Sequence, residues 1–380
     1  MKRRARLLAA ALVSAALTSA CSGSPQPRAF DGEVVLGVAV PTSGDLADFG
    51  LTIAQGVQLA ADRRNAAGGL LGREVVVKVV DDKASAASAP DAAQQLVDAN
   101  AKAVVGHFNS GASIAAAPVY AGNGIVQITP TSTNPRLTQL GIPTVFRVTA
   151  TDAAQGPALA AAILGDGHRR PAIVFAAGNT YAEGLSRSVG GALGHAGADV
   201  ATVQPFTSGV RDYTPMLAAA RDGGADSLVV IAEAPQAAEI LLQARDLGLG
   251  LPVYGGDSLA KLELVYRAGS AAEGATITSL LPNLVTGPDR DEALVDAYRD
   301  RFGRNPGLDT PAGVVAAETW FRAVDEAGTF DATAVAAALK GPLTWDSPIG
   351  PIAYDSAGDL RDQMIHTNVV HAGQFVSKTG

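Results

Sequence analysis

Two loops rich in hydroxyl and amide side chains follow predicted β-strands. The first runs from His107 to Ser113 and leads straight into a predicted helix, and the second runs from Thr129 to Pro135. Ligands bind at the carboxyl edge of the strands in open α/β sheets. There, free backbone N–H groups and the positive end of the helix dipole, beside the Ser110 hydroxyl, could hold a carboxylate. Turn formation and N-capping also explain either loop taken alone, so both interpretations stay open.

Motifs for catalysis, metal binding or phosphate binding are absent from the sequence. It contains no His-Glu-x-x-His, no Gly-x-x-x-x-Gly-Lys and no Gly-x-Ser-x-Gly. The histidines are scattered without metal-ligand spacing, and we expect them to be loop or packing residues: His107, His168, His195, His366 and His371. A secreted hydrolase that uses Ser110 would lack a base. We therefore predict a protein that is not an enzyme and has no cofactor or metal.

Length and composition favour two globular units. The chain has 380 residues, 47% hydrophobic and 17% charged, which suits two lobes with buried cores. Its formal charge of -8 would repel phosphate backbones, so we expect no nucleic acid partner.

The first twenty residues form a predicted signal peptide. Basic residues between Lys2 and Arg6 precede an apolar run, and small residues lead to Cys21, the only cysteine of the chain. This junction resembles a lipoprotein lipobox, although Thr18 replaces the usual leucine. We expect lipidation at Cys21 and a flexible tether over residues 21–30. The alternative is simple cleavage after Ala20 that leaves an unused thiol. Either way, the mature protein is exported.

From Glu33 onward, short β-branched runs alternate with alanine-rich amphipathic segments, which is typical of βαβ units and parallel sheets. The first such series ends near Thr129, and a second begins after 145–148. Helices are predicted over 292–302 and 312–327, with Trp320 and Phe321 in the core. The lobe that these late helices join is not determined by the pattern.

Many short motifs in register resemble the leucine/isoleucine/valine-binding protein family of type I periplasmic binding proteins. They include Thr42-Ser43-Gly44, Gly106-His107, Ile128-Thr129-Pro130, Tyr181-Ala182-Glu183-Gly184 and Gln243-Ala244-Arg245. The resemblance implies two doubly wound Rossmann-like α/β lobes joined by three crossing segments, near Ala150, Leu281 and Asp362. Residues 31–150 with 282–362 would form the N-terminal lobe. Residues 151–281 with 363–380 would form the C-terminal lobe.

The resemblance also implies a ligand site in the cleft. Ser110 and Thr133 match hydroxyl residues that bind the α-carboxylate and α-ammonium of an amino acid, and Thr131 matches a backbone-carbonyl partner of the ammonium. Tyr181 matches an aromatic residue that covers the ligand, and Asp257 matches an acidic residue that faces the ammonium. The other candidate ligand-binding residues are Phe49, Phe108, Asn109, Ser132 and Glu233.

Glu233 departs from the family, because leucine-type binders carry a large aromatic residue there. A carboxylate in a dry apolar pocket is costly unless it is paired or solvated. Two interpretations follow: the ligand has a polar or cationic side chain, or Glu233 turns into solvent.

The resemblance predicts an extracytoplasmic substrate-binding protein for amino-acid transport. It would be a monomer, lipid-anchored to the outer face of the membrane, that delivers an amino acid or analogue to an ABC transporter permease. The alternative of the same fold is a sensor subunit that reports its ligand to a membrane receptor.

Overall fold

The computed structural model of the protein describes residues 30–286 and 290–378. The predicted signal peptide, Cys21 and nearly all of the predicted tether lie outside these residues, so lipidation stays a prediction. Within the described ranges, every helix is too short or too polar to cross a membrane.

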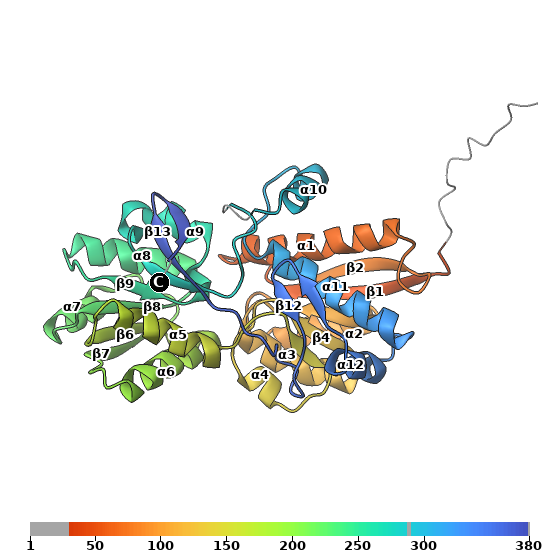
Figure 1. Cartoon of the computed structure of the whole chain (residues 1–380), viewed down its shortest axis with the longest axis horizontal. Coiled ribbons are helices and arrows are strands. Elements are labelled where there is room, and N and C mark those ends of the chain that lie inside the picture. Colours follow the sequence, from red (N-terminus) through yellow and green to blue (C-terminus); the bar gives the residue numbers. More distant parts are fainter. Residues whose placement is uncertain (1–29, 287–289, 379–380) are drawn as a thin grey trace, which may run out of the picture.

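The first lobe is built on a five-stranded parallel sheet with the order β2-β1-β3-β4-β5 (Figure 1). Its central strands are buried on both faces, which explains their nearly continuous Val, Ile and Ala content. The strands are β1 (Glu33–Val40), β2 (Glu74–Asp81), β3 (Ala101–Gly106), β4 (Val126–Thr129) and β5 (Val145–Arg147).

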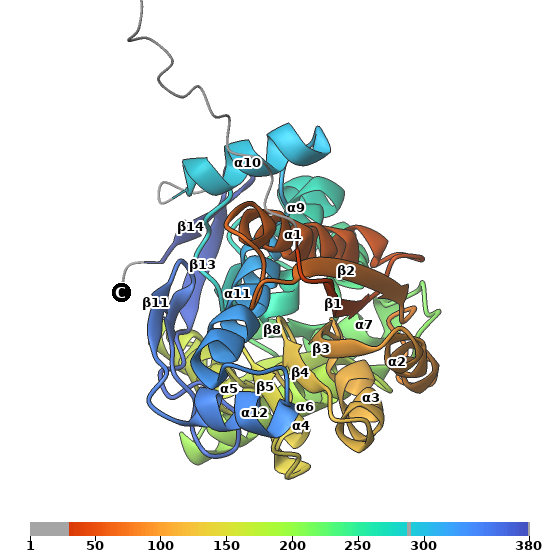
Figure 2. The same ribbon diagram turned by 90° about the vertical axis from the view of Figure 1, so that its right-hand side faces the viewer.

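Helices cover both faces of this sheet, and two of them come from the far end of the sequence. Figure 2 shows α1, α11 and α12 on one face and α2 and α3 on the other. The helices of this lobe are α1 (Ala47–Ala66), α2 (Ala89–Asp98), α3 (Ser110–Gly122), α4 (Arg136–Gln139), α10 (Glu292–Phe302), α11 (Thr310–Ala327) and α12 (Ala332–Lys340). A small antiparallel pair, β11 (Trp345–Ser347) and β12 (Gly350–Ile352), completes the lobe.

Helices α1 and α11 approach each other closely at two glycines. A Cβ on Gly313 would lie 2.5 Å from the Ile53 carbonyl oxygen, and a Cβ on Gly56 would lie 2.5 Å from that of Thr310. This close packing lets Trp320 reach the core, where it is almost fully buried.

The second lobe carries a seven-stranded sheet with the order β14-β13-β10-β9-β8-β6-β7. Its strands are β6 (Pro171–Ala176), β7 (Thr202–Phe206), β8 (Ser227–Ile231), β9 (Val253–Gly255), β10 (Thr276–Ser279), β13 (His366–His371) and β14 (Gln374–Ser377). The last two strands are antiparallel to their neighbours and close one edge. The helices are α5 (Asp152–Gly165), α6 (Thr180–His195), α7 (Thr214–Asp222), α8 (Ala234–Asp246) and α9 (Leu262–Ala268), with 3₁₀ turns η1 (Asp257–Leu259) and η2 (Gly269–Ala272).

The chain passes between the two sheets three times. The passages lie between β5 and α5, between β10 and α10, and between β12 and β13 (Figure 1). Each lobe is therefore assembled from segments far apart in the sequence. The loops after β3 and β4 of the first lobe face the loops after β6, β8 and β9 of the second, so both carboxyl edges meet at one cleft.

Candidate functional site

A cavity of about 320 Å³ lies in the cleft and is lined by both lobes. We call it the central cavity. Its lining residues are Phe108, Asn109, Ser110 and Thr131 from the first lobe, and Tyr181, Glu233, Asp257, Ser258 and Lys261 from the second. Three of these nine side chains carry a charge when ionised, so electrostatics governs what the cavity can hold.

The first lobe contributes hydroxyls and a helix terminus. Ser110 is the first residue of α3, whose initial N–H groups have no acceptor within the helix. The Ser110 hydroxyl is buried and accepts a hydrogen bond from the Asn134 backbone N–H at 3.3 Å, which leaves its own proton for a ligand. Thr131 donates to the Phe108 carbonyl at 2.9 Å and so joins the two loops. This wall suits a carboxylate.

A buried polar chain fixes the loop that carries Ser110. The Nδ1 atom of His107 lies 2.7 Å from Asp82 Oδ2, and its Nε2 atom lies 3.0 Å from the Tyr120 hydroxyl. In the neutral ring, Nδ1 donates to the carboxylate and Nε2 accepts from the phenol. The His107 carbonyl accepts from Thr129 at 2.8 Å, which ties the second loop to the first.

The second lobe contributes Asp257 and Tyr181. Asp257 Oδ1 accepts a hydrogen bond from Gln155 Nε2 at 2.8 Å, and the Tyr181 hydroxyl bonds to Ser258 Oγ at 3.0 Å. Burial raises the pKa of Asp257 above its ordinary value, and it also raises the pKa of Tyr181. A cation next to Asp257 would favour its ionised form, which is the arrangement that an α-ammonium offers.

Asp152, the first residue of α5, is a buried acid close to this wall. Neither of its carboxylate oxygens has a hydrogen-bond partner among the described residues. Burial, with a smaller contribution from the nearby Asp257 carboxylate, raises the pKa of Asp152 to about 7.

Glu233 is partly buried and lines the central cavity. Its Oε1 accepts hydrogen bonds from Asn109 Nδ2 and Asn179 Nδ2, both at 3.2 Å, so the carboxylate bridges the two lobes. Burial raises the pKa of Glu233 to about 7. These contacts favour the interpretation in which Glu233 faces the cleft, and its role in ligand binding stays a prediction.

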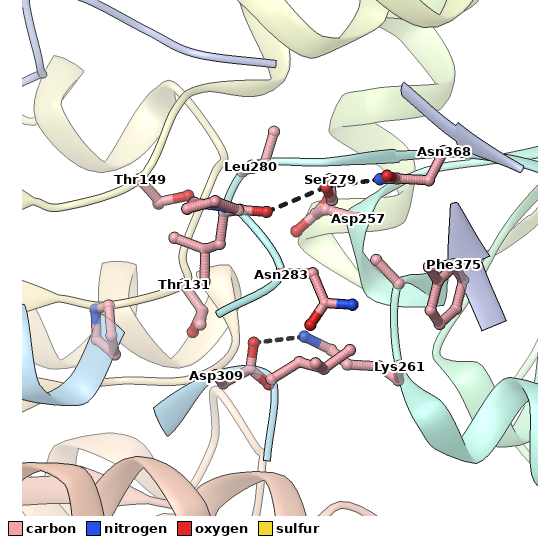
Figure 3. Close-up of a pocket in the computed structure, with 15 residues that line it drawn as sticks. Thr131, Thr149, Asp257, Lys261, Ser279, Leu280, Asn283, Asp309, Asn368 and Phe375 are labelled. Carbon is pink, nitrogen blue, oxygen red and sulfur yellow. Dashed lines mark hydrogen bonds and ion pairs between the residues drawn. The ribbon is translucent and has the colours of Figure 1, made fainter. Parts of the chain in front are cut away.

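Among the residues that the structure describes, Lys261 is the only positively charged one on the wall of the central cavity. It also lines an adjoining cavity of about 570 Å³ near the crossing segments, which Figure 3 shows. There, Thr131 and Asp257 approach the same space from opposite lobes, while Lys261 Nζ lies 2.6 Å from Asp309 Oδ1. The same Nζ lies 5.9 Å from the ring centre of Phe49 and 6.0 Å from that of Phe108.

Seven of the ten predicted ligand-binding residues line the central cavity: Phe108, Asn109, Ser110, Thr131, Tyr181, Glu233 and Asp257. The other three lie beside it. Phe49 stacks on Phe108 with ring centres 6.0 Å apart. Ser132 is buried and bonds to Ser113 Oγ at 2.7 Å, and the buried Thr133 hydroxyl has no partner among the described residues. The ligand contacts of all ten stay predictions.

Sequence reasoning missed Lys261, Ser258, Gln155 and Asn179. Ser258 follows Asp257 directly and Lys261 lies four residues after it, in the loop that follows β9, so their proximity to Asp257 in the sequence was an available signal. Lysine is rarely buried unless it is paired. Its partner Asp309 lies 48 residues away, and no sequence pattern links the two.

The chain belongs to the periplasmic binding protein family, whose model matches residues 33–373. It is 30% identical over 327 residues to the Leu/Ile/Val-binding protein homolog 1 of Brucella suis biovar 1, covering 86% of this chain and 87% of that protein. A leucine-binding protein, LivK, from Thermotoga maritima superposes with a TM-score of 0.83 at 27% identity, over 91% of this chain and 98% of that one. A substrate-binding protein from Desulfitobacterium hafniense in complex with Leu gives a TM-score of 0.76 at 26% identity, over 91% and 100%.

These similarities confirm the predicted family and the predicted type I fold of two doubly wound α/β lobes.

Proposed function

We propose that this protein is the solute-binding component of an ABC importer and that it binds an α-amino acid between its two lobes. One observation carries the proposal: Ser110 and Thr131 from one lobe and Tyr181 and Asp257 from the other converge on one cavity. The similar proteins named above, which are leucine-type binding proteins, support the same ligand class.

In the proposed binding mode, the ligand's carboxylate lies against Ser110 and the first N–H groups of α3. Its α-ammonium lies between Asp257 and Thr131, and Tyr181 covers it from the second lobe. Because each pole of the zwitterion meets a group of complementary charge or dipole, the site selects α-amino acids over amines or acids alone.

Binding in this proposal is coupled to closure of the cleft. The lobes, with the limits 31–150 plus 282–362 and 151–281 plus 363–380, rotate about the three crossing segments as rigid bodies. The closed form then docks on the permease as a monomer held at the outer face of the membrane by a lipid on Cys21. The ligand leaves chemically unchanged.

Calorimetric titration of the refolded, ligand-free protein with the common amino acids tests the proposal. Ser110→Ala and Asp257→Asn should each weaken binding about 10- to 100-fold, since each removes a charge-assisted hydrogen bond. Glu263→Gln on α9, where Glu263 pairs with Arg267 and does not line the central cavity, is the matched control and should leave the affinity unchanged. Failure of every amino acid to bind, or unchanged affinity in both site variants, contradicts the proposal. Recovery of intact ligand, measured by NMR, checks that no turnover occurs.

A further inference from the structure

The charges on the wall of the central cavity do not balance. Glu233 and Asp257 are its acids and Lys261 is its base. Lys261 is already paired with a third carboxylate, that of Asp309, at 2.6 Å. A bound α-amino acid brings one ammonium, which neutralises Asp257, together with one carboxylate of its own. Glu233 is then left partly buried between the lobes without a cation, which is unfavourable.

The Glu233 carboxylate is held in place with one oxygen available. Both amide donors, Asn109 and Asn179, bond to Oε1, and nothing in residues 30–286 and 290–378 donates to Oε2. Glu233 is the residue just before α8, and α8 begins with Ala234 and Pro235. The side chain is therefore positioned by two amides from opposite lobes and presents a fixed acceptor.

The two acids follow neighbouring strands of the second sheet. Glu233 follows β8 and Asp257 follows β9, and these strands pair in parallel with Val230 opposite Gly255. Adjacent strands lie about 4.8 Å apart, so the two carboxylates stand on neighbouring strand ends. One ligand in the central cavity can therefore place its α-ammonium at Asp257 and a second cation at Glu233, since both residues line that cavity.

A further pocket, open to solvent, lies beyond Glu233, and we call it the outer cavity. Asn109 and Glu233 line both it and the central cavity, so they form the wall between them. Arg211, a cation on the outer cavity, is paired with Glu239 at 2.7 Å. The outer cavity leaves space for a side chain longer than that of leucine, directed past Glu233.

We propose that the ligand is an α-amino acid whose side chain ends in a cation, an ammonium or a guanidinium, and that Glu233 binds this cation. The inference rests on the function proposed above and specifies its substrate class. Phe49 and Phe108 pack near the methylene groups of the side chain, and Glu233 Oε2 accepts from its charged end. Each carboxylate of the central cavity then has a cation of its own.

Titration with L-lysine and L-norleucine, which lacks the terminal ammonium, tests this inference on the unmodified protein. Lysine, ornithine or arginine should bind at least about 100-fold more tightly than norleucine. Glu233→Gln should weaken binding of the basic ligand about 100-fold and leave norleucine binding unchanged or tighter. Glu263→Gln is again the matched control. Glu233→Leu should shift the preference toward leucine.

Proton release gives a second readout. The Glu233 carboxyl is faced by Asn109, Asn179, Asp257, Lys261 and Asp309. A bound cation stabilises its ionised form, so basic ligands should release protons at pH 7, seen as a binding enthalpy that depends on the buffer. Glu233→Gln should remove most of this release.

The outcomes separate the two proposals. If leucine or norleucine binds as tightly as every basic amino acid, the cationic ligand is wrong while the amino-acid function stands. If no α-amino acid binds, the proposed function itself is wrong. If Glu233→Gln does not fold, the comparison of lysine with norleucine on the unmodified protein still decides whether the ligand carries a side-chain cation.

Discussion

Lys261 of the second lobe and Asp309 of the first form a buried ion pair across the cleft, with 2.6 Å between Nζ and Oδ1 and side chains only 10% and 4% exposed. Asp309 directly precedes α11, and Lys261 directly precedes α9, so the pair joins two helices of different lobes. When the cleft opens, both groups become hydrated. The pair therefore contributes to closure rather than to the stability of either lobe.

Asp309→Asn should weaken ligand binding. The variant leaves the Lys261 ammonium buried without its carboxylate in the closed form, at a cost of about 3 kcal/mol, or roughly a 100-fold higher Kd. Calorimetry measures the affinity, and small-angle X-ray scattering at saturating ligand measures closure. Asp62→Asn breaks the exposed pair with Arg301 and should cost less than about 1 kcal/mol. Equal affinities of Asp309→Asn and the unmodified protein would contradict this role.

Asp152 should make the ligand-free protein more stable as the pH falls from 8 toward 5. Its pKa is about 7 in the folded protein against an ordinary value of 3.8, so the folded state takes up a proton in this window and the unfolded state does not. Thermal unfolding should show that Asp152→Asn gains less stability than the unmodified protein between pH 8 and pH 5. Glu233→Gln should reduce this pH-dependent gain by a similar amount. Identical pH profiles for Asp152→Asn and the unmodified protein would show that Asp152 is ionised throughout.

Gly313→Ala should destabilise the first lobe. The new methyl group would lie 2.5 Å from the Ile53 carbonyl oxygen, so α1 and α11 must separate, at a cost of about 1–3 kcal/mol. Gly191→Ala in α6 is the matched control, because no atom lies within 4 Å of its Cβ position, and it should raise stability by about 0.4–1 kcal/mol. Chemical denaturation measures the free energy of unfolding of both variants. An unchanged free energy of unfolding in Gly313→Ala would mean that α1 and α11 can separate without cost.

His107→Leu should reduce both stability and ligand affinity. It leaves the buried Asp82 carboxylate without the ring N–H, at a cost of about 3 kcal/mol, and releases the loop that presents Ser110. Tyr120→Phe removes one hydroxyl from the same chain and should cost only about 1 kcal/mol. Thermal unfolding compares the stability of the two variants, and titration compares their ligand affinity. A smaller loss in His107→Leu than in Tyr120→Phe would show that the contact between Asp82 and His107 is dispensable.

Much of the sheet architecture could be predicted because parallel strands are buried on both faces. Continuous apolar runs such as 34–40 and 227–231 are typical of central strands, and they form β1 and β8. The candidate site followed from the same logic, since Ser110, Thr131 and Asp257 all come directly after strands.

Edge strands and long-range pairs could not be predicted in this way. Strand β7 runs from Thr202 to Phe206, and Val203 is 52% exposed because β7 lies at the edge of the sheet. Strands β11 to β14 are short and antiparallel, so they lack the alternating helical segments that mark βαβ units. The partners of Lys261 and Glu233 depend on how the two lobes meet, which local pattern does not encode.

The packing of α11 against α1 has a consequence for how the protein is made. The helix that completes the core of the first lobe begins at residue 310, and the second sheet receives its edge from residues 366–377. A chain emerging from its amino end can therefore finish neither lobe until almost all of it is available. Such a polypeptide stays unfolded through most of its passage across a membrane, which is the state that a translocation channel accepts.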